Sequence, residues 1–269
     1  MFSISVLSAR AVNIGLYAID TEAYLGSASG FICSFNNRHY LVTNWHVLSG
    51  RNFQTDDAIH DSKALPGSMV LNFQVAKRSY SETFTPVSLS TRKIKLLNDS
   101  EQPLWHEHPD FGSKVDVAVF EISYYLKLPE EIQFEAYDFN REKGNDEELN
   151  VMDNVFIVGF PLKTNTTPNQ YPIYKGATIA SEPYLYKVPM FYVDGKTKRG
   201  MSGSAVVKKH GMKVHQEPTQ LRFNEGRLDL IGVYSGRDAV ADSEYEAELG
   251  IVWPFDKCVA PIIEKVNES

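Results

Sequence analysis

Short β-type segments, separated by clusters of Gly, Asn, Asp, Ser and Pro, constrain the fold of this 269-residue chain most strongly. The segments are a few residues long and rich in Val, Ile, Phe and Tyr, which favours strands. Strands that alternate with long helical patterns, as in parallel α/β folds, do not occur. The pattern therefore predicts an all-β protein with antiparallel sheets that close into barrels or form a sandwich. The predicted strands cover residues 29–35, 39–43, 68–75, 115–122, 154–160, 190–193, 203–208 and 228–234.

The length predicts about two domains or one large all-β unit. Residues 126–150 are charged and acidic and separate two strand-rich parts. We interpret this segment as a connection between an N-terminal domain, residues 1–125, and a C-terminal domain, residues 151–269. An ordinary surface loop within one domain is the alternative. The tail after Pro254 predicts a short helix, with Pro261 close to its first turn.

Composition excludes several classes of protein. An apolar fraction of 43% is enough for a real core and excludes disorder as the main state. A net charge of −7 argues against non-specific binding to nucleic acid or acidic membranes. No apolar run is long enough to span a bilayer, and the N-terminus does not read as a signal peptide. Two cysteines provide no disulfide framework, so we expect a cytoplasmic protein in a reducing compartment.

Three residues far apart in the sequence have the types that acyl transfer by serine requires. His46 follows an apolar strand, Asp116 begins one, and Ser202 lies between Gly200 and Gly203. A hydroxyl is a poor nucleophile until a base such as neutral imidazole takes its proton. A buried carboxylate then holds the imidazole tautomer, and glycines let backbone N–H groups face a developing oxyanion. Together the three residues indicate nucleophilic catalysis.

Each of these residues has a plainer interpretation when taken alone. A histidine after a strand is usually structural, an aspartate at a strand end is usually solvated, and Gly-x-Ser-Gly occurs by chance in loops. His106 and His108 flank Glu107 and raise the possibility of a metal site, but no third ligand stands at a recognisable spacing, which favours a surface loop. Asp110 competes with Asp116 for the orienting role, although its loop favours a solvated side chain. Cys33 fits a small core residue better than a nucleophile.

The motifs around these residues resemble those of trypsin-like (chymotrypsin-fold) serine peptidases. Residues 43–46 (TNWH) resemble the Thr-x-x-His motif of that family, and residues 116–119 (DVAV) resemble its Asp-x-Ala-Leu/Val strand. Residues 200–204 (GMSGS) resemble its Gly-x-Ser-Gly-Gly loop, and the order His, Asp, Ser is the chymotrypsin order. Secondary matches lie at residues 26–31, 155–161 and 231–236.

The resemblance implies two six-stranded antiparallel β-barrels, a short C-terminal helix, and a triad in the cleft between the barrels. His46 is expected to be the general base and then the acid, Asp116 its orienting carboxylate, and Ser202 the nucleophile. The N–H groups of Gly200 and Ser202 are expected to form the oxyanion hole. The backbone of residues 235–237 (Ser235, Gly236 and Arg237) is expected to pair with an extended protein or peptide substrate, with Ser235 supporting the aspartate. No metal or organic cofactor is implied.

The chain departs from the family pattern at three points. Met201 replaces the aspartate that pairs with a cleaved N-terminus in digestive members, so that activation route cannot operate, and the usual disulfides are missing, as in bacterial-type members. Ser204 replaces the second glycine. Counting back six positions from Ser202 without gaps places Lys196 at the base of the specificity pocket, with Arg199 and Arg237 near its mouth. A basic pocket favours an acidic side chain or a terminal carboxylate, whereas a solvated loop is the simpler alternative.

These observations predict a serine endopeptidase that works through an acyl-enzyme intermediate. One alternative is a latent protease that needs a regulatory protein partner or a signal, since the long segment between His46 and Asp116 has room for a regulatory surface. Another is a non-catalytic module that binds peptides in the same cleft, although the presence of all three triad residues argues against it.

Overall fold

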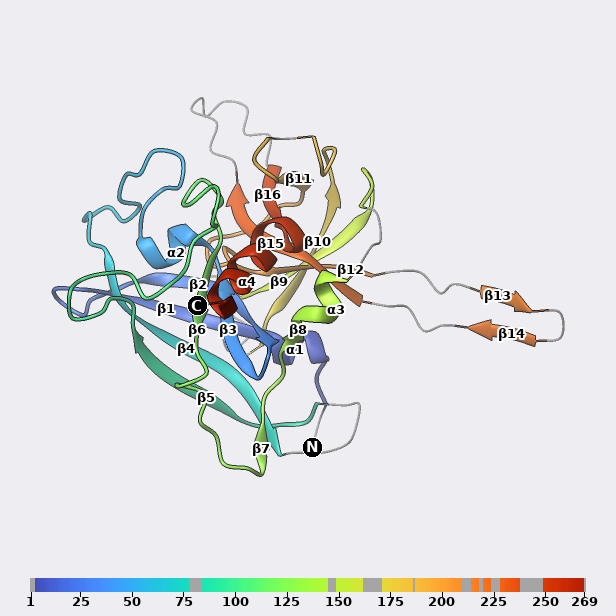
Figure 1. The fold of residues 1–269 in the computed structure, drawn as a ribbon, viewed down its shortest axis with the longest axis horizontal. Coiled ribbons are helices and arrows are strands. Elements are labelled where there is room, and N and C mark those ends of the chain that lie inside the picture. Colours follow the sequence, from blue (N-terminus) through green and yellow to red (C-terminus); the bar gives the residue numbers. More distant parts are fainter. Residues whose placement is uncertain are drawn as a thin grey trace.

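The computed structural model describes residues 3–77, 84–144, 149–161, 171–185, 187–209, 214–217, 220–223, 228–237 and 249–268, with only the backbone described at 214–217, 220–223 and 237 (Figure 1). Its chain forms two main sheets, one from each half of the sequence.

The N-terminal half forms an eight-stranded sheet in which six strands have the order β5-β4-β1-β2-β3-β6. Two short strands join it from the side: β7 pairs with β4, and β8 pairs in parallel with β2. The strands are β1 (Ala11–Ala18), β2 (Tyr24–Phe35), β3 (Arg38–Thr43), β4 (Pro66–Lys77), β5 (Pro86–Lys95), β6 (Ala118–Glu121), β7 (Ile132–Gln133) and β8 (Tyr137–Asp138).

The C-terminal half forms a closed six-stranded barrel with the order β10-β11-β16-β15-β12-β9. Its strands are β9 (Asn154–Gly159), β10 (Ile173–Ile179), β11 (Phe191–Asp194), β12 (Ala205–Lys209), β15 (Leu228–Arg237) and β16 (Leu249–Pro254). Strands β13 (Val214–Glu217) and β14 (Gln220–Phe223) pair with each other as a separate ribbon that extends away from both sheets (Figure 1).

Helices are short and lie at the ends of strands. They are α1 (Val6–Arg10), α2 (Trp45–Ser49), α3 (Phe139–Lys143), a π-helix (η2, Phe255–Val259) and α4 (Ala260–Glu268). Pro261 is the second residue of α4, close to the point where the π-helix passes into the α-helix. The predicted C-terminal helix is confirmed. It is fixed to the N-terminal sheet, because the Asn267 side chain donates to the Tyr40 hydroxyl at 2.6 Å.

The three largest of the four apolar clusters among the described residues hold the molecule together. One belongs to the N-terminal half and includes Leu41 and Phe73, and one belongs to the barrel and includes Ile157 and Met201. The third joins the two halves, with Val117 from the first half packed in one cluster with Trp253 and the C-terminal helix. Because burial of apolar area is the main favourable contribution to folding, this third cluster fixes how the two sheets face each other.

Every predicted strand lies within or overlaps a strand of the structure, and the closed barrel of the C-terminal half is confirmed. Residues 1–125 contribute the six strands β1 to β6 to the N-terminal sheet, and β7 and β8 join it from the segment 126–150. Tyr137 of β8 and the adjacent Phe139 are almost fully buried, which explains why this part of the acidic segment packs onto the sheet. Closure of the N-terminal sheet into a barrel stays a prediction. The segment that connects its end strands, β5 and β6, forms the isolated bridge Leu97↔Pro103, and its His106 forms another with Val119 of β6.

The division into domains at residues 126–150 also stays a prediction. That segment contains β7, β8 and α3. Within the part of the chain that the structure describes, no helix is long and apolar enough to cross a membrane.

Candidate active site

His46 lies in α2, the helix that follows β3 at the end of the N-terminal sheet. The last residues of β3 are fully buried, so the register of the sheet fixes where α2 begins. Helix α2 ends at Gly50, whose φ of 70° is favourable for glycine and whose N–H donates to the His46 carbonyl at 3.0 Å. The preceding residue, Asn44, donates its side-chain amide to the carbonyl of Asp116 at 2.7 Å. The histidine backbone is therefore held to the aspartate segment.

Asp116 is fully buried and has 0% exposure between two buried valines. It lies two residues before β6, at the centre of a tight turn in which the Val117 N–H donates to the Val115 carbonyl at 2.7 Å. The Asp116 Oδ1 atom accepts the His46 backbone N–H at 2.8 Å, and Oδ2 lies 2.6 Å from His46 Nδ1. Burial of an unpaired carboxylate is costly, so these donors are what allow an ionised group to remain here.

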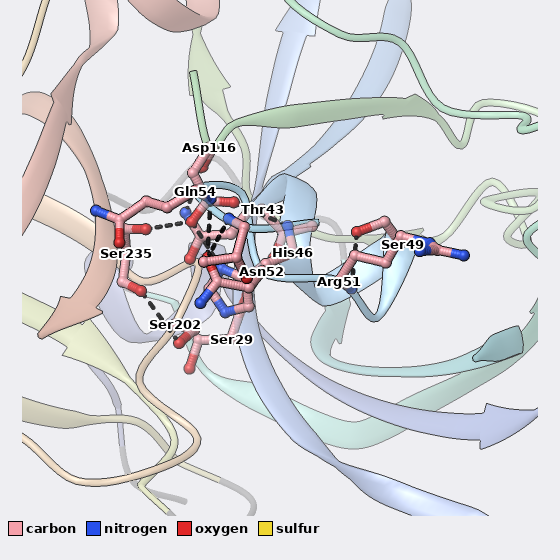
Figure 2. A network of polar contacts seen from close by, with 12 residues as sticks. Ser29, Thr43, His46, Ser49, Arg51, Asn52, Gln54, Asp116, Ser202 and Ser235 are labelled. Carbon is pink, nitrogen blue, oxygen red and sulfur yellow. Dashed lines mark hydrogen bonds and ion pairs between the residues drawn. The ribbon is translucent and has the colours of Figure 1, made fainter. Parts of the chain in front are cut away.

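Ser235 provides a further donor to Asp116, and it comes from the barrel. Its hydroxyl donates to Asp116 Oδ2 (Figure 2). The pairing of β15 with β16 shifts between Tyr234 and Gly236, so Ser235 is the extra residue of a β-bulge. A bulge redirects a side chain that would otherwise follow the alternation of the strand. The structure therefore brings Ser235 to the aspartate, where the sequence motif had predicted it.

The imidazole of His46 is oriented by these contacts. Because a carboxylate only accepts hydrogen bonds, Nδ1 carries the proton, and Nε2 is the acceptor in the neutral ring. The His46 side chain retains 18% exposure and lines a cavity of about 330 Å³ together with Ser202. Other residues that line this cavity are Leu16, Leu25, Ala28, Ile59, Asp61 and Arg199. A basic nitrogen and a hydroxyl thus face the same open space.

Ser202 lies in a loop of residues 199–203, which we call the Ser202 loop. Met201 is buried in the barrel core with 1% exposure, so its apolar side chain anchors the loop where digestive members have the aspartate. Gly200 and Gly203 have φ values of +94° and +83°, which favour glycine. The Ser202 hydroxyl is 3.5 Å from the Ser235 carbonyl.

The N–H groups of Gly200 and Ser202 have no hydrogen-bond acceptor among the described residues. Their neighbours in the same loop do: Met201 N–H donates to the Lys198 carbonyl at 3.3 Å, and Gly203 N–H donates to the Tyr234 carbonyl at 2.8 Å. Two donors next to the hydroxyl are thus available to a ligand oxygen, and their role as an oxyanion hole stays a prediction.

A second cavity also borders Ser202. It is lined by Thr197, Lys198, Arg199, Ser202, Tyr234, Ser235 and Gly236. The Thr197 and Tyr234 hydroxyls lie 2.6 Å apart in its wall, and both side chains are buried. Gly236 leaves room beside the Ser202 hydroxyl, since an added Cβ would lie 3.6 Å from it.

Lys196 does not take the place that the count from Ser202 predicted for it, and this expectation is corrected. Its side chain is exposed and lines neither cavity, whereas Thr197 lines the second one. Burial alternates along residues 195–198, so in this extended segment Thr197 points inward and Lys196 outward. Arg199 is exposed and lines both cavities. The backbone of Arg237 pairs with Gly250, but its side chain lies outside the described residues.

Sequence reasoning gave no role to Thr197, Tyr234 or Ser29. Ser29 lies beside Ser202 and contacts its loop (Figure 2). The alternation of Gly195 and Thr197 with the lysines at 196 and 198 was a possible signal for Thr197. The strand that resembles the Gly-Ser-Gly-Phe motif includes Ser29. Its contact with the Ser202 loop could not be predicted, because a contact between distant segments produces no pattern in a single sequence.

His108, Cys33 and Asp110, which the sequence offered as alternative site residues, have other positions in the structure. His108 is buried, its Nδ1 accepts the N–H groups of Asp110 and Phe111 at 3.2 Å, and its Nε2 donates to the Lys257 carbonyl at 3.0 Å. Among the described residues, no group of three His, Cys, Asp or Glu side chains could hold a metal ion. Cys33 is fully buried, and burial raises the pKa of its thiol. The Asp110 side chain is exposed.

No curated protein matches the chain. Among solved structures, it is similar to the active form of the Rv3671c protease from M. tuberculosis, with 16% identity, a TM-score of 0.48, and coverage of 97% of this chain and 82% of that chain. The inactive form of that protease has 15% identity, a TM-score of 0.43, and coverage of 96% and 89%. The model of the family described as "Trypsin-like peptidase domain" matches residues 28–214, well over half of the sequence. The chain therefore belongs to the trypsin-like peptidase domain family.

Proposed function

We propose that this chain is a serine endopeptidase that hydrolyses peptide bonds through an acyl-enzyme intermediate. The observation that carries the proposal is the pair of hydrogen bonds from the His46 backbone N–H and Nδ1 to the buried Asp116 carboxylate, in a cavity that His46 shares with Ser202. A structural histidine has no need of a fully buried carboxylate behind it and an open cavity in front.

Each step of the reaction uses one of these groups. Ser202 Oγ attacks the scissile carbonyl while His46 Nε2 takes its proton, and the Asp116 carboxylate stabilises the imidazolium that forms. The oxyanion of the tetrahedral intermediate accepts hydrogen bonds from the N–H groups of Gly200 and Ser202. The carbon–nitrogen bond then breaks as His46 returns the proton to the leaving amine. Water repeats the sequence on the acyl-enzyme and releases the acid.

The second cavity provides a place for the side chain that precedes the scissile bond. Its wall carries the Thr197 and Tyr234 hydroxyls, with Lys198 and Arg199 beside them. Hydroxyls and cations favour a polar or acidic side chain. The backbone of residues 235–237 is proposed to pair with the substrate as an added strand. A cleavage profile dominated by basic or large aromatic residues before the cut would refute this preference.

The test of the proposal is labelling with a fluorophosphonate probe, combined with mass-spectrometric cleavage profiling of a peptide library. Wild type is expected to be labelled and to cut peptides internally, and Ser202→Ala is expected to lose the label and about 10⁶ in kcat. Equal labelling of both proteins contradicts the proposal. Labelling of wild type that begins only after a partner or lysate is added indicates the latent protease instead. Peptide binding without any labelling indicates the non-catalytic module.

A further inference from the structure

Ser29 of β2 contacts the Ser202 loop through both its backbone and its side chain, although the two belong to different sheets. Its backbone N–H donates to the Ser202 carbonyl at 2.8 Å, and its hydroxyl donates to the Gly200 carbonyl at 2.7 Å. The side chain of Ser29 has 0% exposure, so neither bond competes with water. One residue of the N-terminal half thus holds both Gly200 and Ser202.

The direction of the Ser29 hydroxyl is fixed by its second partner. The N–H of Phe160, directly after β9, donates to Ser29 Oγ at 2.8 Å. An amide N–H is a donor and a carbonyl oxygen an acceptor, so the hydroxyl proton must point to Gly200. The Ser29 carbonyl is in turn held by the Thr43 hydroxyl at 2.8 Å, only three residues before His46. Ser29 therefore connects the histidine segment, the end of β9 and the Ser202 loop.

These bonds fix two peptide units of the Ser202 loop at both of their polar groups. In the unit between Gly200 and Met201, the carbonyl binds Ser29 and the N–H binds Lys198. In the unit between Ser202 and Gly203, the carbonyl binds Ser29 and the N–H binds Tyr234. Because a peptide unit is planar, each of the two is locked as a whole. The Gly200 N–H belongs to the unit directly before the first locked one, so its direction depends on Ser29. The Ser202 N–H belongs to the unit between the two locked ones, whose Met201 carbonyl also accepts the Ser204 N–H at 3.1 Å.

We propose that Ser29 is a positioning residue that aims the Gly200 and Ser202 N–H groups at the oxyanion. The inference rests on the proposed function. It adds the condition that the two N–H donors are correctly directed only while β2 is docked on the barrel. Loss of the Ser29 hydroxyl releases the Gly200 carbonyl, and the Gly200 N–H loses its fixed direction. Preorganisation of these donors is what gives an oxyanion hole its effect.

Close packing around Ser29 supports this role. An added Cβ on Gly203 would collide with the Ser29 carbonyl and the Thr43 hydroxyl, and one on Gly159 would collide with the hydroxyls of Ser29 and Ser204. Both glycines let the backbone of the barrel approach β2 closely, so the hydrogen bonds of Ser29 reach the loop without an intervening side chain or water.

Ser204 offers a matched control for the test. Like Ser29 it is a fully buried serine close to Gly159, but among the described residues its hydroxyl has no hydrogen-bond partner. Truncation of either serine to alanine removes one buried oxygen, and only the truncation of Ser29 removes a bond to the loop.

The experiment measures the second-order rate of fluorophosphonate labelling against pH for wild type, Ser29→Ala and Ser204→Ala, with thermal unfolding of each. In labelling, the bond from Ser202 Oγ to phosphorus forms, fluoride leaves, the serine proton passes to His46, and the phosphoryl oxygen occupies the oxyanion position. Removal of an oxyanion donor costs about 10²–10³ in rate, so Ser29→Ala is expected to lower the plateau about tenfold to hundredfold. Its pH midpoint, set by His46, is expected to stay at the wild-type value. Ser204→Ala is expected to stay within about twofold of wild type, because the hydroxyl that it removes makes no hydrogen bond among the described residues.

Three results overturn the inference: a wild-type plateau in folded Ser29→Ala, an equal loss in Ser204→Ala, or a shifted pH midpoint, which would place the effect on His46. If Ser29→Ala does not fold, Ser29→Cys retains a weak donor and is expected to give an intermediate plateau, and a wild-type plateau there also refutes the role. Failure of wild type itself to be labelled refutes the proposed function, and this inference with it.

Discussion

The hydroxyl of Ser235 donates to the same Asp116 oxygen that faces Nδ1 of His46. Asp116 precedes β6 of the N-terminal sheet, and Ser235 is the bulged residue of β15 in the barrel. The pair of imidazole and carboxylate is therefore built by one half of the chain and completed by the other. Its geometry depends on how the two sheets dock.

Ser235→Ala is expected to lower both stability and activity. A hydrogen bond to a charged group contributes about 1.5–3 kcal/mol, so the free energy of unfolding should fall by about that amount. We expect kcat/KM to fall about tenfold, the factor that corresponds to about 1.4 kcal/mol of lost transition-state stabilisation. Urea unfolding and peptide hydrolysis check the two values. Unchanged activity would show that the remaining bonds of Asp116 orient His46 without Ser235.

Asp116→Asn is expected to lower kcat by about 10⁴ and to leave the fold intact. The amide has nearly the shape of the carboxylate, but its NH₂ group cannot accept the His46 Nδ1 proton and favours the wrong tautomer. The same substitution at exposed Asp110 is the control, with activity expected near wild type. Steady-state kinetics on a peptide found by cleavage profiling give both values. A comparable loss at Asp110 would mean that the wrong carboxylate has been assigned.

Gly203→Ala is expected to destabilise the protein strongly and to abolish labelling by fluorophosphonate. The residue has φ +83°, and its Cβ would collide with the carbonyl of Ser29. Strain at such a position and the forced backbone shift are expected to cost about 3 kcal/mol or more. Gly176→Ala in β10 is the matched control, since nothing lies within 4 Å of its added Cβ, and its effect is expected within about 0.5 kcal/mol. Thermal unfolding distinguishes the two, and equal melting temperatures would contradict the packing described here.

Glu142→Gln is expected to stabilise the protein relative to wild type increasingly as pH rises above about 4.5. Burial raises the pKa of the Glu142 carboxyl above its ordinary value of 4.5. When the pKa of a carboxyl group is higher in the folded state, the group contributes to the free energy of unfolding at a pH below its unfolded pKa. That contribution is lost as the pH rises through the folded pKa. The amide oxygen of Gln can still accept the Leu230 N–H, which Glu142 Oε2 accepts at 3.0 Å.

Urea unfolding of both proteins between pH 4 and pH 7 measures this difference, and other carboxyl groups cancel because they titrate in both. The loss of the contact with half-exposed Arg141, at 3.9 Å, is expected to matter little. A difference between the two proteins that stays constant over this range would show that Glu142 keeps its ordinary pKa.

Most of the β-structure followed from local sequence, and some strands did not. Segments with a continuous apolar character, such as the one that became β9, were predicted from composition alone. Strands β1, β5, β10 and β16 were not predicted. In β5 most side chains are polar and exposed or half-buried, so its register with β4 and not its own composition makes it a strand. Strands β7 and β8 have two residues each and exist only through their partners.

The sequence by itself determined the residue types and motifs around His46, Asp116 and Ser202, because the base, the carboxylate and the hydroxyl that this chemistry needs each lie in a short local motif. Tertiary structure alone decided that Thr197 and not Lys196 lines the second cavity, since one step in an extended chain reverses the direction of a side chain. It alone also placed Ser29 against the Ser202 loop and Ser235 against Asp116. Such contacts join residues more than a hundred positions apart, and they arise from the packing of two sheets, which no local pattern encodes.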